Sequence, residues 1–80
     1  MYYTYILENP DGRLYIGQSD NVEKRLLRHN SNMVKSTKHK GSWKLIYSRA
    51  FAARSEAVAC ETYLKSLKSS KYIKSYIVGS

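Results

Sequence analysis

Residues 3–17 read Tyr3-Thr4-Tyr5-Ile6-Leu7-Glu8-Asn9-Pro10-Asp11-Gly12-Arg13-Leu14-Tyr15-Ile16-Gly17. Two alternating runs flank a strong turn sequence, in which Pro presets one backbone angle and Gly accepts positive φ. The runs are therefore predicted to pair as an antiparallel hairpin with strands over 2–7 and 13–17. Tyr5 and Tyr15 then lie on neighbouring strands. Gly17 is expected to end the second strand, where the backbone needs positive φ or another group approaches too closely for a side chain.

A helix is predicted to follow the hairpin. Asp20 or Asn21 can cap a helix over about 22–30, because both side chains can accept hydrogen bonds from the free backbone N–H groups of its first turn. Arg25 and His29 lie four residues apart and therefore share one face of this helix. This pair places a fixed cation and a titratable imidazole beside each other.

The C-terminal half is predicted to add one strand and two helices. Residues 43–47 alternate and read as a third strand of the sheet. Ser55 is the expected N-cap of a helix over about 56–68, and a short last helix is expected over about 71–78. Glu61 lies within the apolar stripe of the first of these helices, where a carboxylate is costly without a cation or a metal. That stripe consists of Ala57, Cys60, Leu64 and Leu67.

These elements predict an α+β fold, with a three-stranded antiparallel sheet flanked by about three helices in a single compact domain over residues 1–80. Lys and Arg number 14 against 6 Asp and Glu, for a net charge of +8. This excess indicates a polyanionic partner, nucleic acid before an anionic membrane, although it could also serve only to keep the protein dispersed. A single cysteine, Cys60, fits a reducing compartment. Without a signal peptide or a long apolar run, a cytoplasmic protein that does not attach to membranes is expected.

The segment over 30–42 has no clear period and is rich in Lys, Ser and Thr, which is typical of a basic surface loop. Lysines and hydroxyl groups are expected to contact phosphates, and such contacts give salt-sensitive binding with weak sequence preference. The candidate nucleic-acid-binding residues are Arg28, Lys35, Ser36, Thr37, Lys38 and Lys40.

Several stretches match one known family in order along nearly the whole chain. They are Tyr3-Thr4-Tyr5, Leu14-Tyr15-Ile16-Gly17-Gln18-Ser19, Arg25, Leu26-Leu27-Arg28-His29-Asn30, Ser55-Glu56-Ala57 and Glu61. The chain resembles the GIY-YIG nuclease superfamily, and within it the small single-domain URI-type bacterial branch. Tyr-Ile-Gly alone is a weak signal. Its combination with the helical Arg and His, the basic loop and the helical Glu is a strong one.

The resemblance implies hydrolysis of DNA phosphodiester bonds with a single divalent ion, Mg²⁺ or alternatively Mn²⁺. Glu61 is the implied metal ligand, since one carboxylate with waters suits Mg²⁺. The alternative for Glu61 is a buried salt bridge to Arg25 or Lys44. Arg25 would contact the scissile phosphate through its fork of donors.

His29 would take a proton from water or from a tyrosine, or orient a tyrosine hydroxyl, unless it is only a surface or capping histidine. Tyr5 is assigned to the attacking water and Tyr15 to the phosphate, with cross-strand packing as the alternative for both. Because a free phenol has a pKa of about 10, either one acts as a base only beside positive charge.

Three departures from the family pattern keep a second hypothesis open. Tyr3 and Thr4 stand where the family has Gly and Ile, Gln18 stands where repair nucleases often have Lys, and no Asn follows Asn32. The first hypothesis is a monomeric, structure-directed endonuclease acting on branched, nicked or otherwise non-standard DNA in repair or recombination, with or without an unidentified protein partner. The second is a nucleic-acid-binding module of the same fold that has weak or no catalysis. A small basic scaffold protein is the third.

Overall fold

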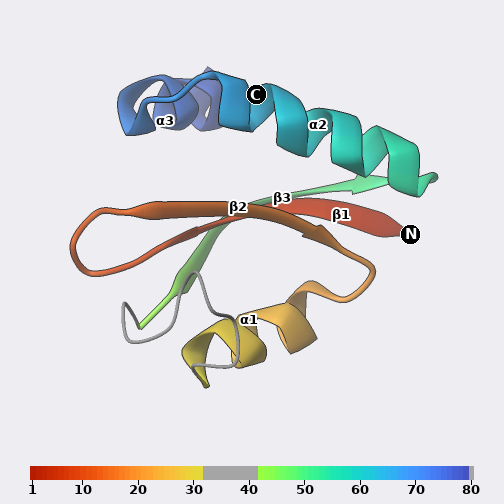
Figure 1. The fold of residues 1–80 in the computed structure, drawn as a ribbon, viewed down its shortest axis with the longest axis horizontal. Coiled ribbons are helices and arrows are strands. Elements are labelled where there is room, and N and C mark those ends of the chain that lie inside the picture. The colour runs from red at the N-terminus through yellow and green to blue at the C-terminus, as the bar shows by residue number, and fades with distance from the viewer. Residues whose placement is uncertain (32–41, 80) are drawn as a thin grey trace.

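The computed structural model describes residues 1–31 and 42–79 and has the predicted α+β architecture. The strands form one antiparallel sheet in the order β2-β1-β3. Figure 1 shows α2 and α3 over one face of this sheet and α1 over the other. In chain order the elements are β1 (Tyr2–Glu8), β2 (Leu14–Ser19), α1 (Val22–Asn30), β3 (Lys44–Phe51), α2 (Arg54–Ser66) and α3 (Ser70–Gly79).

Asn9 stabilises the hairpin turn through its side-chain hydrogen bonds, and Gly12 adopts the positive φ that the turn requires. The Asn9 side-chain oxygen accepts from the backbone N–H groups of Asp11 at 3.1 Å and Arg13 at 2.8 Å. Gly12 has φ +82°, a conformation that other residues adopt only with strain. The turn therefore fixes the register that places Tyr5 opposite Gly17.

The alternation of β1 divides its side chains between two apolar clusters. Ile6 packs toward α2 and α3, in a cluster with Ile16, Leu64 and Ile73. Tyr5 and Leu7 face the other way and cluster with Trp43, against Tyr15 of β2 and the α1 residues Val22 and Leu26. The candidate catalytic tyrosines thus lie on the α1 side of the sheet.

Two strands run further than predicted. The second strand was expected to end at Gly17, but β2 continues to Ser19, and Gly17 has no positive φ. The third strand was expected over 43–47, but β3 runs from Lys44 to Phe51 along β1. An irregularity opposite Ile6 and Leu7 shifts its register, which disturbs the alternation from which the strand was predicted.

The helix α1 spans the predicted residues, and Asn21 is its cap, since its side-chain oxygen accepts from Lys24 N at 3.0 Å. The second helix was expected over 56–68 with Ser55 as N-cap, which is wrong by two residues at each end. Ala53 is the N-cap of α2, and its N–H donates to the Glu56 carboxylate at 3.1 Å. The helix ends early because Lys68 turns to φ +56°. The last helix was predicted closely and starts at Ser70.

Asn30 joins the end of α1 to the start of the third strand. Its amide oxygen accepts from Trp43 N at 2.6 Å, and its amide nitrogen donates to Trp43 O at 3.1 Å. This pair of bonds imitates a step of a β-ladder and ties Asn30 to Trp43.

Thr4, which replaces the family's Ile, is fully buried on the α2 side of β1. Its hydroxyl donates to the carbonyl of Ala57 in α2 at 2.7 Å. The departure at this position is therefore a structural contact between strand and helix, on the opposite face from Tyr5.

Replacing Thr4 with Val is expected to reduce the free energy of unfolding by about 1 kcal/mol, because the shape is kept and one buried hydrogen bond is lost. Urea unfolding measures the change, with Thr62→Val as the matched control. The exposed Thr62 hydroxyl bonds only to Val58 O within its own helix, so this control should remain close to wild type. A Thr4→Val protein as stable as wild type would show that the contact contributes nothing.

Candidate active site

Two tyrosines and a histidine form a cluster on the α1 side of the sheet. The Tyr5 hydroxyl oxygen lies 3.1 Å from His29 Nε2, within hydrogen-bond distance. The Tyr15 and His29 ring centroids are 4.4 Å apart, and the Tyr5 and Tyr15 centroids 6.3 Å apart. Tyr5 is 2% exposed and His29 1% exposed, whereas Tyr15 is only half-buried. Tyr15 is thus the phenol with more access to solvent, and Tyr5 is the inner one.

Gly17 makes room for this cluster. A Cβ atom placed on Gly17 would lie 2.6 Å from the Tyr5 hydroxyl oxygen and 3.1 Å from a Tyr15 ring carbon. The sequence-based alternative of a close approach at Gly17 is therefore confirmed, and that of a positive φ is wrong.

Both partners of the hydrogen bond are neutral at physiological pH. Burial raises the pKa of Tyr5 to about 12, and the nearby Tyr15 adds to the rise. Burial also lowers the pKa of His29, with a further decrease from the Arg25 charge. A neutral imidazole that carries its proton on Nδ1 accepts the Tyr5 proton at Nε2. The pair can therefore hold a proton between a phenol oxygen and an imidazole nitrogen.

The lowered pKa of His29 predicts a dependence of stability on pH. Because the unfolded chain binds a proton more readily than the folded one, the stabilisation is complete above the unfolded pKa of about 6.5 and is lost as the pH falls through the folded pKa. Unfolding at pH 7.5, 6.5 and 5.5 should show stability falling toward acid in the wild type and less so in His29→Gln. An NMR titration should place the His29 midpoint below 6.5. A midpoint above 6.5 would contradict the prediction.

Arg25 and Glu61 lie on helices that cover opposite faces of the sheet, Arg25 on α1 and Glu61 on α2 (Figure 1). Both act electrostatically on Tyr5: the Arg25 charge lowers its pKa and the Glu61 charge raises it. The Glu61 side chain is 19% exposed and pairs with Lys65 at 2.7 Å, one turn later in α2. The sequence left open a salt bridge from Glu61 to Arg25 or Lys44. That alternative named the wrong partner, because Glu61 pairs with Lys65.

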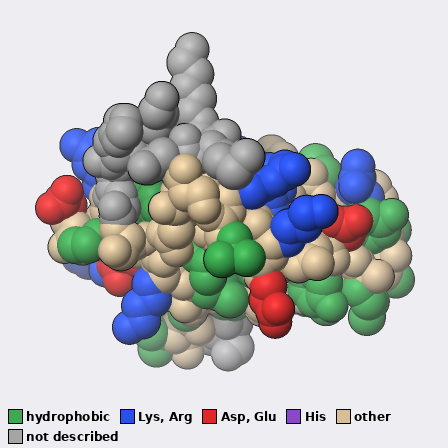
Figure 2. Space-filling view, turned by 90° about the horizontal axis from the view of Figure 1, so that it is seen from below, with side chains coloured by type: hydrophobic (Ala, Val, Ile, Leu, Met, Phe, Trp, Pro, Cys, Tyr) green, Lys and Arg blue, Asp and Glu red, His purple; other side chains and the backbone are tan. Residues whose placement is uncertain are grey.

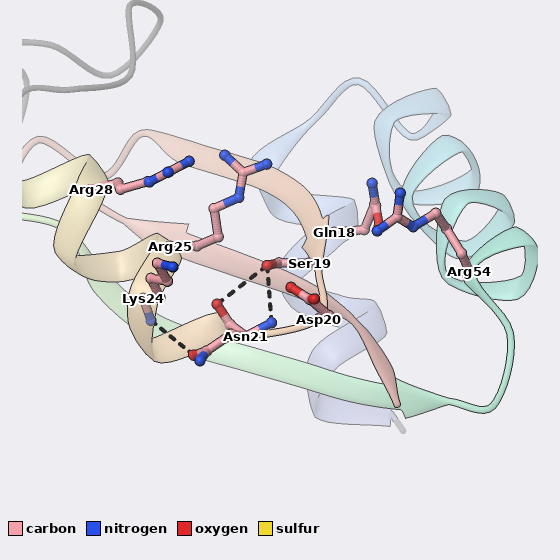
Figure 3. Close-up of a pocket in the computed structure, with 8 residues that line it drawn as sticks. All are labelled: Gln18, Ser19, Asp20, Asn21, Lys24, Arg25, Arg28 and Arg54. Atoms are coloured by element: carbon pink, nitrogen blue, oxygen red, sulfur yellow. Dashed lines mark hydrogen bonds between the residues drawn. The ribbon is translucent and has the colours of Figure 1, made fainter.

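Beside the cluster lies a pocket of about 270 Å³, called here the cationic pocket. Figure 3 shows Arg25 and Arg28 extending into this region from α1, and Arg54 extending from α2 toward Gln18. Sequence reasoning selected Arg25 and Arg28 and missed Lys24, Arg54 and Gln18. The pocket is lined by Gln18, Ser19, Asp20, Asn21, Lys24, Arg25, Arg28 and Arg54.

The remaining candidates are Arg28 of α1 and residues of the basic segment over 30–42. Arg28 is exposed and lines the cationic pocket, while Lys35, Ser36, Thr37, Lys38 and Lys40 lie outside the described residues. Figure 2, seen from the α1 side, shows basic side chains next to one another on the surface. No helix in the described part of the chain is long and apolar enough to cross a membrane.

A metal ion at this site would have one acidic ligand. Within residues 1–31 and 42–79 there is no group of three or more His, Cys, Asp or Glu that could enclose an ion. The partly exposed carboxylate of Glu61 still fits Mg²⁺, which prefers hard oxygen ligands and retains several waters.

The family model of the GIY-YIG catalytic domain matches residues 1–74. The chain belongs to the GIY-YIG family. This confirms the resemblance, and it means that the chain carries a nuclease-type domain. The matched range of this chain includes Tyr5, Tyr15, Arg25, His29 and Glu61.

The similar proteins are small bacterial ones, as expected from the URI-type resemblance. A UPF0213 protein of Staphylococcus saprophyticus is 35% identical over 74 residues, covering 91% of this GIY-YIG chain and 90% of the relative. A UPF0213 protein of Streptococcus pneumoniae is 42% identical over 67 residues, covering 82% and 68%. The solution NMR structure of a UPF0213 protein from Bacillus halodurans has a TM-score of 0.57 at 33% identity, over 99% of this chain and 84% of the other.

Proposed function

We propose that this GIY-YIG domain is a metal-dependent endonuclease that hydrolyses phosphodiester bonds in branched, nicked or otherwise non-standard DNA. The observation that carries the proposal is the 3.1 Å contact between the Tyr5 hydroxyl and His29 Nε2, beside Tyr15 and within the electrostatic influence of Arg25 and Glu61. Phosphodiester hydrolysis needs a proton acceptor for water and positive charge for the phosphate oxygens. These residue types supply both.

In this proposal each side chain has a distinct role. Arg25 donates to the scissile phosphate and offsets charge that builds up on its oxygens. His29 accepts the Tyr5 hydroxyl proton at Nε2 while the Tyr5 oxygen takes a proton from the reacting water, which leaves hydroxide to attack and a protonated imidazole. The assignment of Tyr5 to the water and Tyr15 to the phosphate remains a prediction. Because Tyr5 is only 2% exposed, it suits proton transfer to His29 better than direct contact with solvent. Tyr15 is more exposed and is the better candidate for contacting the substrate.

Glu61 would hold the divalent ion through its carboxylate, displacing Lys65 from the ion pair. When bound, Mg²⁺ or Mn²⁺ would supply charge stabilisation for the phosphoryl group and its leaving oxygen. Thr4 lies on the opposite face of β1 from Tyr5 and contacts Ala57 O, so its departure from the family pattern does not touch the tyrosine cluster.

Recognition of DNA structure, not sequence, is favoured by the surface. The cationic pocket presents Lys24, Arg25, Arg28 and Arg54, side chains that suit phosphates. Contacts of this kind position the backbone without reading base edges. A domain of 80 residues can offer a backbone-binding surface next to the site, and a junction or nick would then determine where cleavage occurs.

The test is cleavage of end-labelled branched, nicked, single-stranded and plain duplex DNA, with Mg²⁺, Mn²⁺ or EDTA. The expected result is metal-dependent cutting near the junction or nick and little cutting of plain duplex. Tight, salt-dependent binding without cutting would favour the binding-module hypothesis. The absence of binding at low salt would favour the scaffold protein.

Replacing Arg25 with Ala is expected to slow cleavage by about a hundredfold, as for removal of one donor to a charged transition state. Single-turnover cleavage with saturating enzyme measures this change and separates it from weaker binding. The matched control is Arg13→Ala, since Arg13 is exposed beside the hairpin turn and its side chain lines no part of the cationic pocket. Equal rates for the two variants would remove Arg25 from the proposed site.

A further inference from the structure

The cationic pocket is larger than one arginine contact requires, and its lining comes from three parts of the chain. Gln18 and Ser19 belong to β2, Lys24 belongs to α1, and Arg54 is the first residue of α2. Its volume of about 270 Å³ is far above the roughly 10–15 Å³ that a single water requires, so a phosphate group can enter it.

Charge in this pocket is unbalanced. Four cations line it against one acid, Asp20. In the described part of the chain the ion pairs are Lys65 with Glu61 and Lys74 with Glu8, so none of the four cations takes part in one. Several cations around one concave surface create a positive potential that attracts anions.

Gln18 provides an independent observation. Its side-chain oxygen is buried and has no hydrogen-bond partner. A buried polar atom without a partner is costly, so it requires an explanation. The same carboxamide carries an NH₂ group, whose two N–H donors suit a phosphate oxygen.

A contact with the Tyr2 ring holds the Arg54 side chain in position. Its guanidinium carbon lies 5.1 Å from the centroid of the Tyr2 ring, a cation–π contact that leaves the N–H donors available. Figure 3 shows its guanidinium beside Gln18, on the opposite side of the pocket from Arg25 and Arg28. A single phosphate on Arg25 would leave the Arg54 side of the pocket unused.

We infer that the cationic pocket binds a second phosphate group of the DNA strand, with Arg54 and Gln18 as its main contacts, separate from the scissile phosphate assigned to Arg25. The inference rests on the proposed function and gives it a substrate feature. The group is either an internal phosphodiester next to the cut or the terminal 5′-phosphate at a nick. Both present the same oxygens to the donors, and the terminal one carries more charge.

The experiment measures binding, so it does not depend on turnover. Fluorescence anisotropy with nicked DNA compares wild type and Arg54→Gln, while single phosphates near the nick are replaced one at a time by neutral methylphosphonates. At one position the replacement should weaken wild-type binding about tenfold and leave Arg54→Gln nearly unchanged, because the contact is already lost. A parallel pair of oligonucleotides with 5′-phosphate or 5′-hydroxyl at the nick distinguishes the terminal from the internal phosphate.

Arg49→Gln is the matched control, since Arg49 lies on β3 outside the pocket lining and contacts Phe51 and Tyr76. It should remain as sensitive as wild type to every replacement. Gln18→Leu should reproduce part of the Arg54→Gln effect, and circular dichroism shows that each variant is folded. If wild type and Arg54→Gln lose equal affinity at every position while cleavage proceeds, the second phosphate site is overturned and the nuclease stands. If the effect of a phosphate replacement depends on Arg54 but no DNA is cleaved, the second phosphate site is supported and the nuclease is rejected. If the protein binds no DNA at all, both are rejected.

Discussion

Replacing Glu61 with Gln is expected to lower the rate of DNA cleavage by about a thousandfold, which corresponds to about 4 kcal/mol of transition-state stabilisation. The change is nearly isosteric and removes one negative charge. The half-buried carboxylate lies on α2, close enough to Tyr5 to raise its pKa, and its described ion-pair partner is Lys65. If Glu61 serves only as a helix ion pair, its removal should cost at most about 0.5 kcal/mol of stability and no activity.

A measurement of metal binding distinguishes the two possible roles of Glu61, metal ligand and helix ion pair. Mn²⁺ binding, followed by paramagnetic broadening of NMR signals, should be lost in Glu61→Gln and retained in Asp11→Asn, which removes the same charge from the exposed hairpin turn. Lys65→Gln should strengthen Mn²⁺ binding, because the competing cation at 2.7 Å is gone. Undiminished cleavage by Glu61→Gln would remove the metal from this position altogether.

The order of the elements could be predicted from local patterns, because each pattern depends on residues close together in sequence. The turn at Asn9-Pro10-Asp11-Gly12 and the polar cap before α1 are examples. The end of β3 depends on a distant contact, because Tyr2 pairs with Phe51 across the sheet. The start of α2 is local, since Glu56 reaches back to Ala53, and was missed because Ser55 was taken as the cap.

The same distinction applies to the candidate site. Tyr5, Tyr15 and His29 could be selected because the hairpin register and a helical spacing of four bring them to one side. The Glu61–Lys65 pair follows the ordinary i,i+4 spacing and was overlooked because Glu61 was taken to face inward. Arg54 was also missed, because its nearness to Gln18 depends on how α2 crosses the sheet.

Replacing Gly17 with Ala is expected to lower the free energy of unfolding by about 2–3 kcal/mol, the usual range for forcing one extra methyl group into a filled site. The new Cβ would lie 2.6 Å from the Tyr5 hydroxyl oxygen and 2.7 Å from its ring carbon Cζ. The Tyr5 ring is 2% exposed and hydrogen-bonded to His29, so it has little room to move aside. Urea unfolding measures the loss, and NMR reports whether the His29 ring signals shift.

Gly12→Ala is the matched control, because Gly12 has φ +82° and nothing within 4 Å of an added Cβ. It should lose about 1 kcal/mol through backbone strain alone and leave the His29 signals in place. Adding Tyr5→Phe removes the hydroxyl but not the contact at Cζ, so it should only partly restore the stability of Gly17→Ala. A Gly17→Ala protein with wild-type stability and unchanged His29 signals would show that the tyrosine pair is loosely packed. A loosely packed pair could not hold the Tyr5 hydroxyl against Nε2, and the proton relay proposed for this site would lose its structural basis.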